Sequence, residues 1–281
     1  MGLQRPTRPR WPEATGICYY KLTDVYPACA WATGDWYGVP KIAYYLSAQA
    51  YQPLHACAVF DHLAVPEGEG LTAPIFLLDD ADQLVSGWRV LSRVFDASLK
   101  EVARAEFTGA GGIERVRRLG ELVVPPERAR SHPLLVVTEV RSGSRLRDRT
   151  FYWLNYAANP GCLFALPQTR LRVRAEANRF IIENRGSVPA VGVHFDCPEI
   201  SDRFVAEDAY FWLDPGERRS VRVSATTGVT IGAWNAPPAA GTDGACPLER
   251  FRVESQNVGL EEFSPAPAPP LPACAGFRGM P

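Results

Sequence analysis

The sequence lacks a long hydrophobic run, and it lacks an excess of charge of either sign. No stretch of its 281 residues approaches the roughly 18 consecutive apolar residues that a membrane-spanning helix needs. Residues 1–14 are basic but contain no apolar stretch of the kind found in a signal peptide. The formal net charge is −1, which argues against binding nucleic acid or an anionic membrane by bulk charge. We therefore expect a soluble, cytoplasmic protein with neither nucleic acid nor a membrane as a partner.

The sequence also has few residues in metal-binding patterns. Its four histidines show no metal-ligand spacing, and its seven cysteines contain no Cys-x-x-Cys pair. An odd number of cysteines without such pairs predicts free thiols in a reducing compartment, not a disulfide framework or a zinc site. The glycine-rich residues 109–112 lack the spacing of a phosphate-binding loop. We expect no metal and no cofactor.

The order of patterns along the chain predicts four parts. Residues 1–52 have the pattern of a strand, a loop and a helix. Residues 53–158 and 159–236 each contain short β segments separated by turn residues. Residues 237–281 are rich in proline and alanine, so we expect this tail to be disordered.

Within the first part, the apolar residues 16–22 have the composition and length of a strand. Pro40 stands where a helix would start, since proline suits the first helical position. Apolar residues at spacings of three and four then predict a helix over residues 41–52, which Pro53 stops.

The two middle parts predict tandem immunoglobulin-like β-sandwiches, because each has several short β segments with alternating polarity. The segments expected in the first sandwich are 54–60, 74–78, 87–95, 101–107, 120–124, 134–141 and 149–156. Those expected in the second are 171–175, 179–183, 190–196, 208–213, 220–224 and 229–234.

Aromatic residues are concentrated near a carboxylate in the first part. Asp24 lies just past the expected strand, and the carboxyl ends of strands are where α/β barrels carry ligand chemistry. Flat aromatic faces suit the apolar faces of sugar rings, although core packing is the more common role of large aromatics. The aromatic residues are Tyr19, Tyr20, Tyr26, Trp31, Trp36, Tyr37, Tyr44 and Tyr45.

Several motifs follow one another in a fixed order. They are Gly16 to Pro27 (GICYYKLTDVYP), Trp31, Asp35 to Lys41 (DWYGVPK), Tyr44-Tyr45, residues 151–155 (FYWLN), residues 183–190 and residues 210–217 (YFWLDPGE). In this order they resemble glycoside hydrolase family two, especially its β-mannosidase-like members. The resemblance implies a mainly β chain, in which two tandem immunoglobulin-like sandwiches follow the last βα unit of an incomplete (β/α)₈ barrel. It also implies a β-linked glycoside as the carbohydrate partner.

The resemblance implies that four residues line a sugar pocket and serve there as an aromatic platform and as hydrogen-bonding groups. They are Tyr20, Lys21, Asp24 and Trp31. The family has tryptophan at the position of Tyr20 and glutamine at that of Lys21, so a preference for mannosides stays open. Asp35 and Lys41 are expected to brace the loop and the helix. A purely structural reading, with Asp24 as a loop brace, is the alternative.

No residue matches the two catalytic glutamates of the family, one of which stands in an Asn-Glu pair. The chain contains no Asn-Glu dipeptide, and retaining glycosidases need both carboxyl groups on one rigid frame. We therefore name no catalytic residue and expect the isolated chain to be inactive. The chain is expected to be the C-terminal part of a longer enzyme, to complete a barrel supplied by another chain, or to be a remnant. The alternative function is a non-catalytic carbohydrate-binding or docking module.

Arginines are frequent between residues 115 and 149. Their alternation with apolar residues is typical of a solvated strand face, and recognition of an acidic glycan or a partner is the alternative.

Overall fold

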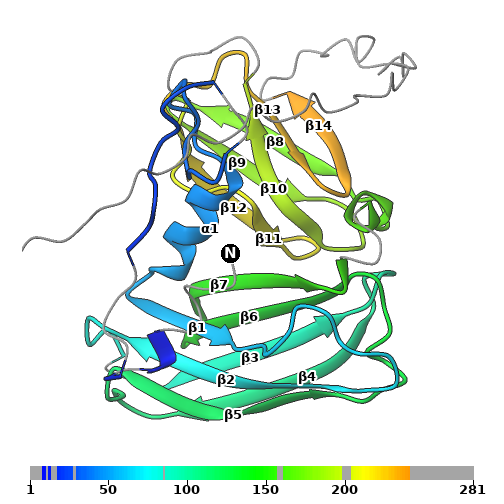
Figure 1. The fold of residues 1–281 in the computed structure, drawn as a ribbon. Helices are drawn as coiled ribbons and strands as arrows, with labels where there is room; N and C mark the ends of the chain where they lie inside the picture. The colour runs from blue at the N-terminus through cyan, green and yellow to red at the C-terminus, as the bar shows by residue number, and fades with distance from the viewer. Residues whose placement is uncertain are drawn as a thin grey trace, which may run out of the picture. The chain divides into compact units, whose positions relative to one another are not determined.

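A computed structural model of the protein describes residues 8–10, 12–13, 18–27, 30–84, 86–156, 161–197 and 204–240, and it shows a mainly β chain (Figure 1). The helical elements are the 3₁₀ helices η1 (Arg8–Arg10) and η3 (Cys162–Ala165) and the helix α1 (Ile42–Ala50). No helix in the described part of the chain is long and apolar enough to cross a membrane.

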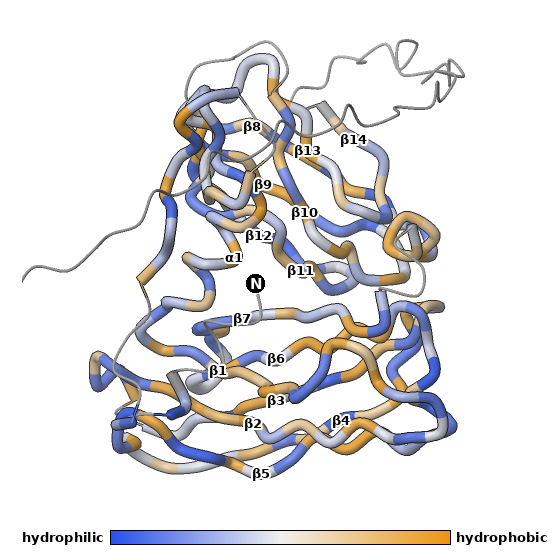
Figure 2. The backbone as a smooth tube through the Cα atoms, viewed as in Figure 1, coloured by the Kyte–Doolittle hydropathy of each residue, from blue (hydrophilic) through white to orange (hydrophobic). Residues whose placement is uncertain are grey.

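The first sandwich is built from strands that pack two antiparallel sheets face to face. They are β1 (Leu54–Ala58), β2 (Leu71–Asp79), β3 (Trp88–Phe95), β4 (Glu101–Gly109), β5 (Val116–Val124), β6 (Leu134–Ser142) and β7 (Arg145–Leu154). One sheet has the order β1-β2-β5 and the other β4-β3-β6-β7. Their inner faces bury one apolar core, in which Ile75, Val90 and Leu122 are fully buried. Apolar and polar residues alternate along β4 and β5, as expected for strands with one solvated face (Figure 2).

The second sandwich repeats this arrangement. Its strands are β8 (Leu171–Glu176), β9 (Arg179–Asn184), β10 (Ala190–Asp196), β11 (Phe211–Leu213), β12 (Arg218–Arg222), β13 (Thr230–Ala233) and β14 (Ala236–Ala240). They form the sheets β12-β9-β8 and β11-β10-β13-β14. In both sandwiches the first, second and fifth strands therefore make one sheet, and the fourth, third, sixth and seventh make the other. The expectation of a mainly β chain with two tandem immunoglobulin-like sandwiches is confirmed.

The second sandwich extends further than its sequence pattern indicates. We expected the disordered tail to begin at residue 237, but β14 runs to Ala240 and pairs with β13. Pro237 and Pro238 are compatible with this strand because β14 lies at the edge of its sheet and its pairing with β13 is irregular between Ile231 and Ala233, and proline is tolerated at edges and bulges. Residues 241–281, the rest of the expected tail, lie outside the described residues.

The expected N-terminal strand is not found in the part of it that the structure describes. Residues 18–22 are irregular, and residues 16 and 17 lie outside the described residues. A strand needs a neighbour for its backbone hydrogen bonds, and the described chain provides only an isolated bridge from Thr23 to Gly34. The expectation of a helix start at Pro40 is also wrong. Pro40 still forms an extended bridge with Gly34, so the helix begins at Ile42.

A third apolar cluster joins the two sandwiches. Phe95, Val137 and Phe151 of the first sandwich pack with Val191 and Trp212 of the second. The rings of Phe95 and Trp212 are 5.0 Å apart between centroids. The two sandwiches therefore share a buried interface and are not independent modules on a flexible linker.

Candidate functional site

Residues 18–27 and 30–41 are irregular, and backbone hydrogen bonds between them close a loop. The amide of Gly34 donates to the carbonyl of Leu22 at 2.8 Å, and the amide of Lys41 donates to Thr33 at 2.8 Å. The hydroxyl of Thr33 also donates to the carbonyl of Leu22 at 2.9 Å. The segments around Leu22 and Gly34 are thus held together by hydrogen bonds without forming a β-sheet.

Asp24 is buried inside this loop and paired with Lys41. The Nζ of Lys41 lies 2.5 Å from Oδ2 of Asp24, whose side chain is only 2% exposed. Lys41 also donates to the carbonyl of Ala30 at 3.1 Å. Because Lys41 directly precedes α1, this ion pair fixes the loop to the start of the helix. Asp24 therefore has the geometry of a loop brace, which was the structural alternative for this residue.

Asp35 braces a turn of the same loop, as expected. Its Oδ1 accepts a hydrogen bond from the amide of Val39 at 2.8 Å, and its own amide donates to the carbonyl of Val39 at 3.0 Å. Asp35 and Lys41 thus both act on the loop conformation.

The aromatic residues of the loop are exposed. Tyr20 is 80% exposed and Trp31 is 71% exposed, and large parts of Tyr26, Trp36 and Tyr37 are accessible as well. Lys21 is half-buried, and its carbonyl accepts a hydrogen bond from Thr33. No hydrogen bond, ion pair or ring contact joins the side chains of Tyr20, Lys21 and Trp31 in the described part of the chain. The structure thus leaves Tyr20 and Trp31 available at the surface and places Asp24 beneath it.

Helix α1 connects this loop to the second sandwich. Gln49 donates to Oδ1 of Asp208 at 2.8 Å and to the buried carbonyl of Ala209 at 3.0 Å. Tyr45 packs into the core of the second sandwich, and its hydroxyl accepts a hydrogen bond from the amide of Ala206 at 3.3 Å. Burial raises the pKa of the Tyr45 hydroxyl above its ordinary value of 10.0. Local sequence patterns do not indicate these contacts, because the partners of Gln49 and Tyr45 lie about 160 residues away in the chain.

Arg149 makes a second link, between the two sandwiches. Its guanidinium contacts Glu139 at 2.8 Å in the first sandwich, and Glu217 at 2.6 Å and Asp214 at 3.3 Å in the second. Arg93 reaches Asp214 at 2.8 Å from the first sandwich. The expectation that the arginines of residues 115–149 form a solvated face is therefore wrong for Arg149, whose side chain is 6% exposed.

The charged side chains that link the two sandwiches shift one another's pKa values. Burial opposes ionisation of Glu139, but the attraction of Arg149 and hydrogen bonds from Arg141 and Arg149 outweigh it and lower the pKa of Glu139. Burial also opposes the charge on Arg149, but Glu217, Glu139 and Asp214 together raise its pKa. Glu139 and Arg149 are therefore both charged at neutral pH.

The described residues contain no group of three or more histidine, cysteine, aspartate or glutamate side chains that could hold a metal ion. The candidate site is a set of exposed aromatic side chains on a loop that Asp24 and Lys41 brace.

The sequence of the second sandwich matches a known domain. The Ig_mannosidase family model, described as an Ig-fold domain, matches residues 164–237. This part of the chain is similar to the Ig-fold domain that the model describes. The resemblance to the C-terminal portion of a β-mannosidase-like glycoside hydrolase is thereby confirmed. No curated protein sequence is detectably similar to the chain.

Solved structures share the fold of the chain. The exo-chitosanase CsxA of Amycolatopsis orientalis matches 84% of the chain at 18% identity, with a TM-score of 0.64. The β-D-mannosidase of Dictyoglomus thermophilum matches 83% at 15% identity, with a TM-score of 0.60. The matches cover 32% and 28% of those proteins, so the chain spans about a third of their length. Residues 54–240, which contain the two sandwiches, make up about two thirds of the chain. The matches cover 84% and 83% of the chain, so the similarity extends beyond the two sandwiches.

Proposed function

We propose that this chain functions as the C-terminal part of a glycoside hydrolase that acts on β-linked sugars and is β-mannosidase-like. The mannosidase-type Ig-fold domain and the fold shared with an exo-chitosanase and a β-D-mannosidase support this function. The observation that carries the proposal is the exposed aromatic surface of residues 19–37, which Asp24 and Lys41 brace from beneath.

In this proposal Tyr20 and Trp31 are the sugar platform. Each offers a flat apolar face to solvent, and Tyr20 adds a hydroxyl that can bond a sugar hydroxyl. Lys21 supplies hydrogen-bond donors beside them. Asp24 acts as a positioning residue that holds the loop through Lys41, because it is buried and already paired.

We further propose that residues 1–52 contribute the loop and the helix of the last βα unit of a barrel and that both catalytic glutamates lie outside this chain. Barrel enzymes collect catalytic groups from the ends of several strands. A single loop and helix therefore supply part of the sugar pocket and no pair of carboxylates. In this proposal residues 53–158 and 159–240 serve as the two sandwiches that carry this unit, and residues 241–281 as a tail.

The alternative is a docking module without a sugar site of its own. The same exposed rings are the kind of apolar patch that marks a protein interface, and the partner would be the barrel portion on another chain. Binding of free sugar separates the two functions.

The experiment combines turnover and binding on the purified chain. Incubation with p-nitrophenyl β-D-mannoside and p-nitrophenyl β-D-glucosaminide should release no p-nitrophenol. Titration with mannose, glucosamine and their β-linked disaccharides should change tryptophan fluorescence in a saturable way. Replacement of Trp31 by alanine should abolish the change, whereas Phe164→Ala, which removes an equally exposed ring from η3, should leave it intact.

Turnover by the isolated chain would refute the placement of the catalytic groups. Absence of a saturable signal, or equal loss in both variants, would refute the sugar platform and leave docking. Docking is then tested by light scattering with the candidate barrel chain, where an unchanged monomer mass contradicts it.

A further inference from the structure

The outer face of the sheet β12-β9-β8 carries a positively charged surface. Strand pairing aligns Arg172, Glu183 and Arg218 in one row across the three strands. The next row contains Arg174, Ile181 and Ser220, and the third contains Glu176, Arg179 and Arg222. All five arginines are exposed, and they face two glutamates, so the face has an excess of positive charge.

The ion pairs on this face leave part of that charge uncompensated. Glu183 contacts both Arg185, at 3.1 Å, and Arg218, at 3.3 Å. Arg174 pairs with Glu176 along its own strand. Arg172 has no ion-pair partner among the described residues, so its planar guanidinium is available to an anion.

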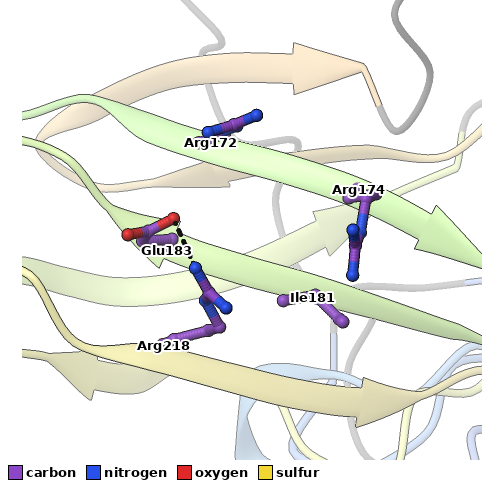
Figure 3. Close-up of a pocket in the computed structure, with 5 residues that line it drawn as sticks. All are labelled: Arg172, Arg174, Ile181, Glu183 and Arg218. Carbon is purple, nitrogen blue, oxygen red and sulfur yellow. Dashed lines mark hydrogen bonds and ion pairs between the residues drawn. The ribbon is translucent and has the colours of Figure 1, made fainter.

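The same residues line a shallow hollow. Figure 3 shows Arg172 and Arg174 on β8, Ile181 and Glu183 on the middle strand β9, and Arg218 on β12. The half-buried Ile181 contributes an apolar surface between these charged side chains. Arg172 and Arg218 are two strands apart, which corresponds to about 9.5 Å between their backbones.

We propose that this hollow binds an acidic oligosaccharide whose carboxylates pair with Arg172 and Arg174 on one side and Arg218 on the other. A guanidinium binds a carboxylate through two parallel hydrogen bonds, which gives both strength and geometric specificity. Glu183 accepts hydrogen bonds from sugar hydroxyls between those carboxylates, and Ile181 contacts the apolar face of a ring.

The chemistry of the face favours a uronate over nucleic acid. Glu176 and Glu183 interrupt the basic rows and can accept hydrogen bonds from hydroxyl groups, which a sugar offers at every unit and a DNA backbone does not. The face has no exposed aromatic ring for base stacking, and the whole chain has a net charge of −1. A glycan with spaced carboxylates and many hydroxyls fits both the arginines and the glutamates.

The test is isothermal titration of the full chain with tri-galacturonic acid at physiological salt. The double variant Arg172→Ser with Arg174→Ser should weaken binding about tenfold or more, because it removes two charged donors. The matched control is Arg104→Ser with Arg118→Ser, which changes the net charge equally but removes exposed arginines of the first sandwich. The control should bind like the unmodified chain, and both variants should keep its thermal midpoint.

Several results would overturn the proposal. They are absence of saturable binding, equal weakening in both double variants, equal binding of the neutral methyl ester, and displacement of the uronate by single-stranded DNA. This site does not depend on the proposed hydrolase function. Trp31→Ala should bind tri-galacturonic acid normally, so failure of the aromatic platform and failure of the arginine face are separate outcomes.

Discussion

Arg149 offers the sharpest test of how the two sandwiches are joined. Replacing it with methionine keeps much of the side-chain volume and removes the charge. Breaking a buried ion pair by removal of one partner costs about 3–5 kcal/mol, because the remaining charge is left without compensation. Arg149 serves three carboxylates, so its loss affects Glu139, Asp214 and Glu217 together.

The surroundings reduce this cost. Glu139 keeps Arg141 at 2.9 Å, and Asp214 keeps Arg93 at 2.8 Å. The side chains of Asp214 and Glu217 are about a quarter exposed, so water compensates them in part. We therefore expect the lower end of the range, about 3 kcal/mol, for Arg149→Met. For a protein of this size that corresponds to a fall in Tm of about 6–12 °C.

Urea unfolding followed by tryptophan fluorescence measures this loss, with calorimetry for the Tm. Arg141→Met is the matched control, because Arg141 pairs with Glu139 but is one-third exposed. The control should lose about 1 kcal/mol or less. A loss below about 1 kcal/mol for Arg149→Met, or an equal loss in both variants, would show that Arg149 is not the buried link between the sandwiches.

The remaining predictions concern the pH dependence of stability, the contact of helix α1 with the second sandwich, and the close packing of Gly192 against Trp234. The lowered pKa of Glu139 stabilises the fold above its ordinary value of 4.5, so the stability difference from Glu139→Gln should be full at neutral pH and shrink as pH falls below 4.5 in urea titrations. Gln49→Ala should lower the free energy of unfolding by about 1–2 kcal/mol, since it removes two hydrogen bonds to the second sandwich. Gly192→Ala should cost more than Gly216→Ala in Tm, because both glycines have positive φ but only the Cβ at Gly192 would meet the Trp234 ring, at 2.7 Å.

The strands were largely predictable because alternation of polarity is a local signal. The expected segment 190–196 matches β10 at both ends, and 101–107 differs from β4 by two residues at one end. The hairpin of β8 and β9, which turns at Ala177, is also indicated by local sequence, because both strands have alternating apolar residues that face the same core. The last strand, β14, could not be predicted. Two consecutive prolines indicate a loop, and only the folded chain shows that this segment lies at the edge of a sheet.

The links between elements could not be predicted from local patterns. Arg149 has the same alternating context as its exposed neighbours, and its partners on the second sandwich lie 65 and 68 residues later. Gln49 occupies an ordinary helical position, and only the folded chain shows that it contacts Asp208. For Asp24, position in the sequence favours a ligand-binding carboxylate, and only the folded chain shows that its Oδ2 is paired with Lys41.

These links together explain how the second sandwich can support the proposed sugar platform, which it does not itself line. The pair of Asp24 and Lys41 fixes the aromatic loop to helix α1, and Gln49 with Tyr45 fixes the helix to the second sandwich. The buried charges around Arg149 then fix that sandwich to the first. Each step relies on a buried contact, so the aromatic surface is held at a defined orientation. A rigid support of this kind lowers the ordering cost of binding, since the platform is formed before the sugar arrives.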